Sequence, residues 1–196
     1  MPAAHRALVL KTDAFDQSVR ARRAADMKCR AGCSACCGAQ LTVSDVEAAL
    51  LREGTGTLDE PAVRRLAARL EGLVDGSPCV FLDDDGRCSV YASRPLVCRT
   101  QGLPLRYPAG VIPPEAILSR GRGTGDAITW CPLNFTERAP AAEDVLDAER
   151  VDVMLALSNQ GAGGDPVRRT TLSDLAREVV SEGEGESESE GEGGAR

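Results

Sequence analysis

Aromatic side chains are scarce in this sequence. Its 196 residues include only three Phe, two Tyr and one Trp. Because large rings supply much of the buried area of an ordinary core, we expect another source of stability to help hold this fold together. The eight cysteines are the obvious candidates.

Long apolar runs are also missing. No stretch approaches the ~20 residues that a membrane span requires, and Lys11, Asp13 and Asp16 interrupt the apolar core that a signal peptide would need. The sequence therefore predicts no membrane association and a cytoplasmic location. Cysteines stay reduced there, which favours metal ligands or redox groups over disulfides.

Histidine is almost absent, and so are the usual signs of catalysis. His5 is the only histidine, and we expect it to be an exposed residue of a helix far from the cysteines. No Cys–His pair and no nucleophile elbow is recognisable, so the sequence leaves open whether the protein is an enzyme.

Two other motifs have simpler interpretations. Residues 83–85 are three aspartates, but the bidentate Glu that follows in a calcium loop is missing, so we interpret them as a hairpin tip. Residues 121–125 resemble a phosphate-cradling glycine loop. No clear strand leads into them, and we interpret them as a flexible loop.

The net charge of −7 is unevenly distributed. Residues 181–196 contain six Glu against one Arg and almost no apolar side chain, which predicts a disordered acidic tail. Residues 1–30 contain seven Lys or Arg against three Asp. No aromatic residues interleave with the basic cluster, which favours a solvated helix face over nucleic-acid binding. No protein partner is indicated.

The pattern of apolar residues, caps and turns predicts an α+β fold that is mostly helical. The predicted helix caps include Ser44 with Glu47 at capping-box spacing, Asp59 and Thr171. We expect helices over residues 4–27, 44–54, 60–73, 93–98, 140–159 and 172–180, an extended piece at 41–43, a short β-hairpin at 79–91 and an irregular stretch at 102–127. The predicted organisation is an N-terminal helix (1–28), a small metal-stabilised cysteine-cluster domain (29–135), C-terminal helices (136–180) and the tail (181–196).

The cysteines are the strongest functional signal. All eight lie between residues 29 and 131, and two cysteines at CxxC spacing can reach one ion from a tight turn. A set of ligands that is nearly all sulfur favours zinc, copper(I) or an iron–sulfur cluster. The predicted metal ligands are Cys29, Cys33, Cys36, Cys37, Cys79, Cys88, Cys98 and Cys131.

How the ligands are divided is left open. Eight thiolates could form two four-cysteine sites, one multinuclear site, or a single four-cysteine site with spare thiols. The adjacent side chains of Cys36 and Cys37 diverge on either a strand or a helix, which favours two metals close together. The alternative is that one of this pair packs as a small apolar residue.

Cationic residues near the cysteines could compensate the charge of a thiolate site. Arg94 lies one helical turn before Cys98, and Arg99 follows it directly. We expect these two arginines to donate hydrogen bonds to the sulfurs or to lower their thiol pKa values, although ordinary solvated charges remain the alternative.

Residues 79–99 resemble a known family. They contain Cys79, Cys88 and Cys98, with Tyr91 and Arg94 between them. This run is similar to the signature of the YkgJ-type cysteine-cluster proteins, also described as the CxxCxxCC zinc- or iron-chelating family. The other half of the family signature resembles the upstream cysteines of this sequence, which have one extra residue between the first two: Cys29, Cys33, Cys36 and Cys37. Cys131 resembles the family's late cysteine.

The resemblance implies zinc or iron chelation, and some members are described as iron–sulfur proteins. A similar domain occurs in flagellin lysine N-methylases, but no methyl-donor site is visible here. The leading hypothesis is therefore a metal-binding protein whose zinc or iron is structural or is its cargo, since structural zinc contributes about 10–16 kcal/mol of apparent binding energy. The alternative is an iron–sulfur protein with redox or methylase-associated chemistry.

Overall fold

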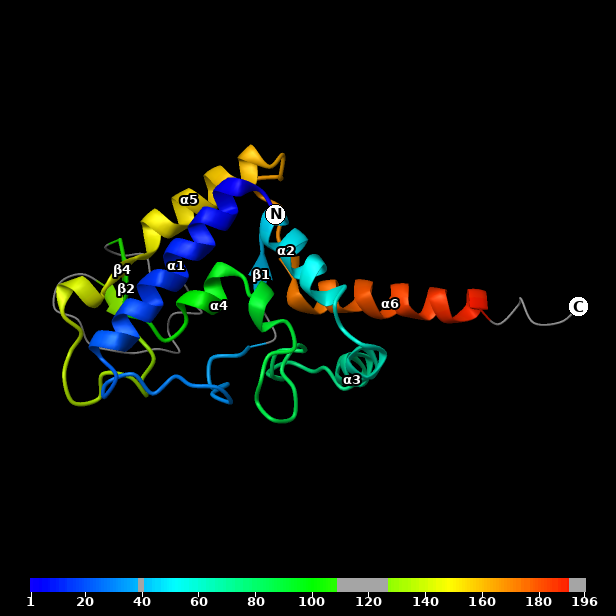
Figure 1. Cartoon of the computed structure of the whole chain (residues 1–196), viewed down its shortest axis with the longest axis horizontal. Coiled ribbons are helices and arrows are strands. Elements are labelled where there is room, and N and C mark those ends of the chain that lie inside the picture. The colour runs from blue at the N-terminus through cyan, green and yellow to red at the C-terminus, as the bar shows by residue number, and fades with distance from the viewer. Residues whose placement is uncertain (39–40, 109–126, 191–196) are drawn as a thin grey trace, which may run out of the picture. The chain divides into compact units, whose positions relative to one another are not determined.

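The computed structural model describes residues 1–38, 41–108 and 127–190 (Figure 1). The described residues form six α-helices and five very short strands, so the predicted α+β, mostly helical class is confirmed. The helices are α1 (Ala3–Arg22), α2 (Asp45–Thr55), α3 (Glu60–Glu71), α4 (Leu96–Thr100), α5 (Ala148–Gly161) and α6 (Leu172–Glu190). The strands are β1 (Thr42–Val43), β2 (Leu105–Tyr107), β3 (Ala127–Thr129), β4 (Leu146–Asp147) and β5 (Thr170–Thr171).

The chain divides into two compact units. Unit 1 combines Met1–Cys36 with Leu96–Pro166, and unit 2 combines Cys37–Pro95 with the chain from Val167 onward. Each unit is therefore built from two separated segments. The predicted linear division differs from this, because the stretch 29–135 contributes to both units. The boundary falls between the adjacent cysteines Cys36 and Cys37.

Unit 1 is organised by α1, which packs against α4 and α5 (Figure 1). Its buried face begins at the N-terminal end, where Leu8 and Val9 meet Leu96 of α4 and Val151 and Leu155 of α5. A second apolar cluster lies at the other end of α1, around the only tryptophan: Val19, Met27, Leu103, Trp130 and Phe135.

One prediction about α1 is wrong. His5 is fully buried instead of exposed. It precedes Leu8 and Val9 by three and four residues, so it lies on the same helix face as these core side chains. The single-helix pattern did not reveal that two other helices would cover this face.

The β structure of unit 1 is a three-stranded sheet in the order β3-β2-β4, with β2 antiparallel to β3 and parallel to β4. The sequence predicts residues 102–127 as irregular, whereas Leu105–Tyr107 form the central strand. The helix expected from residue 140 begins only at Ala148, because the Asp147 carboxylate caps it by accepting from the Arg150 N–H at 3.0 Å. A 3₁₀ turn, η3 (Ala142–Asp144), and β4 precede it.

Unit 2 packs α2 and α3 against α6, and β1 pairs with β5 in antiparallel register. Its helix starts agree with the predicted caps. The Ser44 N–H donates to the Glu47 carboxylate at 3.1 Å, Asp59 accepts from the Ala62 N–H at 2.9 Å, and Thr171 accepts from the N–H of the third α6 residue at 3.0 Å. The core contains Val43, Leu51, Leu66, Phe81 and Leu175, among other residues.

The predicted hairpin at residues 79–91 is reduced to a single bridge between Leu82 and Cys88. The turn itself is present: the Asp83 N–H donates to the Arg87 carbonyl at 2.7 Å, and Gly86 has the positive φ of 77° that such a turn requires. The ladder ends early because the Cys79 N–H donates to the Cys37 carbonyl, at 3.3 Å, in a different segment.

Helix α6 continues to Glu190, although the sequence assigns residues 181–190 to the disordered tail. Glu is a good helix former, which favours extending a helix that the core has already started. The tail residues 191–196 and the glycine-rich residues 121–125 lie outside the described residues. Within the described parts of the chain, no helix is both long and apolar enough to cross a membrane.

Candidate metal centre

In unit 1, two cysteines lie around one glycine. Gly102 follows α4 with φ +89°, and a Cβ added there would lie 2.6 Å from the Cys29 Sγ and 4.0 Å from the Cys131 Cβ. Any larger residue would therefore collide with the sulfur and would also be strained in its backbone. The glycine lets the Cys29 sulfur rest directly against the main chain, beside Cys131.

A buried amide contacts the same sulfur. The Asn134 Nδ2 donates to the Cys29 Sγ at 3.2 Å and to the Gly102 carbonyl at 2.8 Å, and its Oδ1 accepts from the Lys28 N–H at 2.7 Å. A turn brings this asparagine close to the second cysteine, since the Asn134 N–H donates to the Cys131 carbonyl at 2.9 Å. Sequence reasoning missed Asn134, because nothing in the spacing links position 134 to position 29.

Burial sets the protonation of Cys29. Burial raises the pKa of its thiol, the hydrogen bond from Asn134 lowers it, the neighbouring Cys131 raises it, and the charge of Arg20 lowers it. The net shift is upward, so the thiol stays protonated at neutral pH in the metal-free chain. A metal ion would have to displace that proton, as is usual for thiolate ligands.

In unit 2, the segment carrying Cys37 lies beside Cys79. An isolated bridge pairs Gly38 with Pro78, next to the hydrogen bond from the Cys79 N–H to the Cys37 carbonyl. The turn at residues 83–86 returns the chain so that Cys88 pairs with Leu82, and both Cys79 and Cys88 pack against the apolar core of this unit. Cys79 and Cys88 thus lie on the core of unit 2, and the main chain of Cys37 is hydrogen-bonded to that of Cys79.

Desolvation dominates the chemistry of these thiols too. Burial raises the pKa of Cys79 to about 11, while a hydrogen bond from the Phe81 main chain and the charge of Arg69 act in the opposite direction. Burial likewise raises the pKa of Cys88, against a main-chain hydrogen bond from Val90 and the charge of Arg94.

The two arginines that the sequence selects lie in different surroundings. Arg94 stacks over the Tyr91 ring at 3.5 Å from its centroid, and its charge lowers the pKa of Cys88. Arg99 is buried, and its Nη1 donates to both carboxylate oxygens of Asp13 of α1, at 2.9 and 2.7 Å. Its role toward the sulfurs stays a prediction.

Arg69 of α3 is a cation that sequence reasoning missed. Its guanidinium donates to the Val80 and Leu82 carbonyls, both at 3.1 Å, and to the Asp83 carboxylate at 2.6 Å. It therefore holds the main chain on either side of Phe81 and lowers the pKa of Cys79. Its position on a helix ten residues before that cysteine gave no signal.

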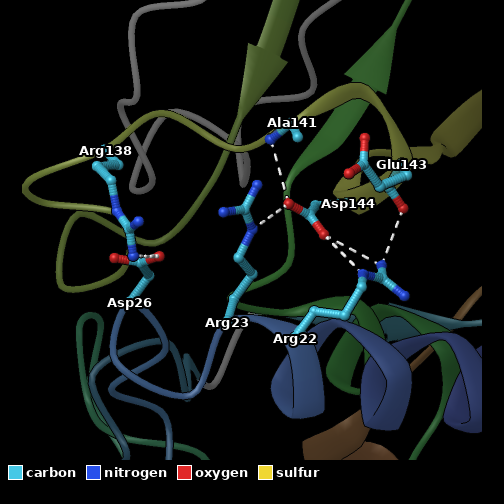
Figure 2. A network of polar contacts seen from close by, with 7 residues as sticks. All are labelled: Arg22, Arg23, Asp26, Arg138, Ala141, Glu143 and Asp144. Atoms are coloured by element: carbon cyan, nitrogen blue, oxygen red, sulfur yellow. Dashed lines mark hydrogen bonds and ion pairs between the residues drawn. The ribbon is translucent and has the colours of Figure 1, made fainter.

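The basic cluster near the N-terminus is used within unit 1. Figure 2 shows the Asp144 carboxylate between the guanidinium groups of Arg22 and Arg23, with a second pair between Arg138 and Asp26. Asp144 is fully buried. Part of the face that the sequence predicts to be solvated is thus engaged in ion pairs.

The remaining cysteines are Cys33, Cys36 and Cys98, all half-buried. All eight cysteines lie within the described residues, and all are thiols. In residues 1–38, 41–108 and 127–190, no three Cys, His, Asp or Glu side chains are already placed to hold one metal ion. The grouping of all eight as ligands therefore stays a prediction.

The donor chemistry nevertheless fits a soft metal. Both groups offer half-buried or buried sulfurs, and one sulfur rests in a cradle that only glycine permits, with an amide N–H aimed at it. Such N–H···S hydrogen bonds are the usual outer-shell partners of thiolate ligands. Zinc, copper(I) and iron are the metals that sulfur donors select.

Comparison with known proteins agrees with this chemistry. A family model described as "CxxCxxCC: Putative zinc- or iron-chelating domain" matches residues 28–109. The matched range includes every cysteine except Cys131. No curated protein and no solved structure matches the chain. The family model that matches residues 28–109 is that of the family that the cysteine pattern resembles.

Proposed function

We propose that this protein binds zinc or iron through cysteine thiolates, that each of its two units holds its own metal-binding thiols, and that the metal stabilises the fold. The observations that carry the proposal are the Cys29 sulfur held beside Cys131 in unit 1 and the pair Cys79 and Cys88 packed on the core of unit 2. The match to a zinc- or iron-chelating domain supports the same conclusion. The proposal includes a cytoplasmic location, where cysteines stay reduced.

A structural role is best supported in unit 2. Cys79 and Cys88 pack directly on its core, on either side of a turn that is held by one β-bridge. A metal bound by these two thiolates and Cys37 would tie three loop segments to that core. Burial raises the pKa of both core cysteines, because a buried thiolate without a nearby positive charge is unfavourable. A bound cation would supply that charge.

In unit 1 the proposed ligands are centred on Cys29 and Cys131. The charges of Cys131 and Cys33 both raise the pKa of Cys29, so these thiols are close enough to interact. With Cys36 and Cys98 in the same unit, enough thiolates are available for a second site.

The deciding experiment is anaerobic purification followed by elemental analysis, a sulfide assay and a visible spectrum on one sample. About two zinc ions per chain, without colour, is the expected result if each unit binds one zinc ion through its thiolates. Iron with acid-labile sulfide and a broad visible band would instead establish the iron–sulfur alternative. A chain that contains no metal would refute the proposal.

Variants assign the metal to the units. Cys79→Ser and Cys131→Ser should each lose about one of the two metal ions, one from each unit, because each removes a thiolate ligand from the site of its own unit. Ser89→Ala, next to Cys88 but without sulfur, is the matched control and should retain both. Chelation should lower the melting temperature; an unchanged melting temperature would show that the metal is cargo.

A further inference from the structure

Asn134 connects three separate segments of unit 1 around the Cys29 sulfur. Its side chain is 1% exposed and contacts the main chain before Cys29, the main chain after α4 and the sulfur itself. Its own N–H closes the turn that begins at Cys131. It lies outside residues 28–109, so the family match assigns it no role.

The two main-chain contacts determine which way the amide points. The Lys28 N–H can only donate and the Gly102 carbonyl can only accept, so Oδ1 must face the first and Nδ2 the second. In the reversed orientation, Nδ2 would face the Lys28 N–H, which places two donors together, and Oδ1 would face the Gly102 carbonyl, which places two acceptors together. The remaining N–H of Nδ2 is therefore committed to the Cys29 Sγ.

A fixed N–H donor stabilises a thiolate more strongly than a thiol. A thiolate accepts strongly, whereas a neutral thiol is a weak acceptor and offers a proton of its own. Gly102 also holds the sulfur in place, because the absence of a side chain leaves room for the Cys29 Sγ against the backbone. The Asn134 hydrogen bond thus favours the charged form of Cys29 that binds metal, against the burial that raises the pKa of the free thiol.

Resting on the metal-binding function proposed above, we infer that Asn134 is a positioning residue of the unit 1 metal site, which donates a hydrogen bond to the metal-bound sulfur of Cys29. It orients the sulfur toward Cys131 and stabilises the thiolate. The site therefore extends beyond the matched domain, to the turn that begins at Cys131. Outer-shell partners of this kind typically change metal affinity by about 10–100-fold.

The test is Asn134→Asp in the full-length protein, because aspartate has nearly the same shape but no N–H to donate. Zinc affinity, measured by competition with a chromophoric chelator, should fall by about 10–100-fold at one of the two sites. The matched control is Asn159→Asp, since Asn159 is also buried in unit 1 and donates to a main-chain carbonyl, that of Asp165, at 3.0 Å. The control should keep the affinity of the native chain.

A second variant separates positioning from simple destabilisation. If Asn134 acts through Cys29, Asn134→Asp should lower zinc affinity in the native chain and have no further effect in a Cys29→Ser chain. Equal effects in both backgrounds would overturn the inference, as would an Asn134→Asp protein with native affinity at both sites.

A measurement on the unaltered chain covers the case in which the variant does not fold. With ¹¹³Cd in place of zinc, an N–H···S–Cd hydrogen bond gives a scalar coupling between the metal and the amide proton. A correlation from the Asn134 side-chain amide to ¹¹³Cd is expected, and its absence while main-chain N–H correlations are present would overturn the inference. If the native chain binds no metal at all, the proposed function fails and this inference with it.

Discussion

Replacing Asp144 with asparagine should strongly destabilise unit 1. The buried carboxylate accepts four hydrogen bonds: from the Arg22 Nε and Nη2 at 3.2 and 3.1 Å, from the Arg23 Nε at 2.6 Å, and from the Ala141 N–H at 3.1 Å (Figure 2). Asparagine has one acceptor oxygen. In either orientation of its amide, the NH₂ group would face two of these donors.

The size of the expected fall in the free energy of unfolding follows from the number of hydrogen bonds lost and from the solvent exposure of the two arginines. A hydrogen bond to a charged group contributes about 1.5–3 kcal/mol, and two are lost. The side chains of Arg22 and Arg23 are 42% and 22% exposed, so water replaces part of what the carboxylate supplied. We therefore expect the free energy of unfolding to fall by about 2–4 kcal/mol.

Urea denaturation followed by circular dichroism measures this change directly, and the melting temperature should fall by about 5–12 °C for a chain of this size. The matched control is Asp147→Asn, the same substitution three residues later. Asp147 is an exposed N-cap, and asparagine caps helices equally well, so its effect should be close to zero. Equal stabilities of the two variants would refute the view that the Asp144 network supports unit 1.

Three further predictions concern the pH dependence of Asp144 and two contacts elsewhere in the chain. Burial raises the pKa of Asp144, but hydrogen bonds from Arg23, the Ala141 N–H and Arg22 outweigh burial and lower this pKa below the ordinary 3.8. The stability that ionised Asp144 contributes should therefore be complete above pH 3.8 and be lost as the pH falls through the lower pKa of the folded state. Asp144→Asn should weaken this acid transition. Gly54→Ala should destabilise unit 2 by about 1–3 kcal/mol despite the better helix propensity of alanine, because the new Cβ would lie 2.6 Å from the Ser93 Cβ; thermal melts should show partial recovery on adding Ser93→Gly, and a variant more stable than the native chain would contradict the packing. Asp13→Asn should lower the free energy of unfolding by about 2–4 kcal/mol in urea titrations, since it weakens the ion pair with Arg99, whose side chain is 6% exposed. A loss below ~0.5 kcal/mol would show that this pair behaves as a surface ion pair.

Local signals in the sequence were sufficient for several elements. The Ser44–Glu47 capping box, the Asp59 cap and the Thr171 cap all lie where the sequence predicts them, because a cap involves residues only three apart. The turn at Gly86 is also as predicted. In each case the partners are neighbours in the chain, so spacing alone identifies the contact.

Features that depend on distant partners were not predictable in this way. His5 is buried because α4 and α5 pack near its end of α1, and β2 forms because β3 and β4 lie beside it. The unit 1 cradle depends on contacts between positions 29, 102 and 134, which no short motif connects. Arg69 likewise reaches the Phe81 main chain only through the packing of α3.

The sequence by itself determined that sulfur is the chemistry of this protein. Eight cysteines, one histidine and few aromatics predict a cysteine-cluster protein that resembles the CxxCxxCC family, because side-chain type decides which metals can bind. The tertiary structure decided how those cysteines are divided between two units, and which amide and which glycine surround Cys29. That division arises from the packing of helices far apart in the chain, which residue spacing does not encode.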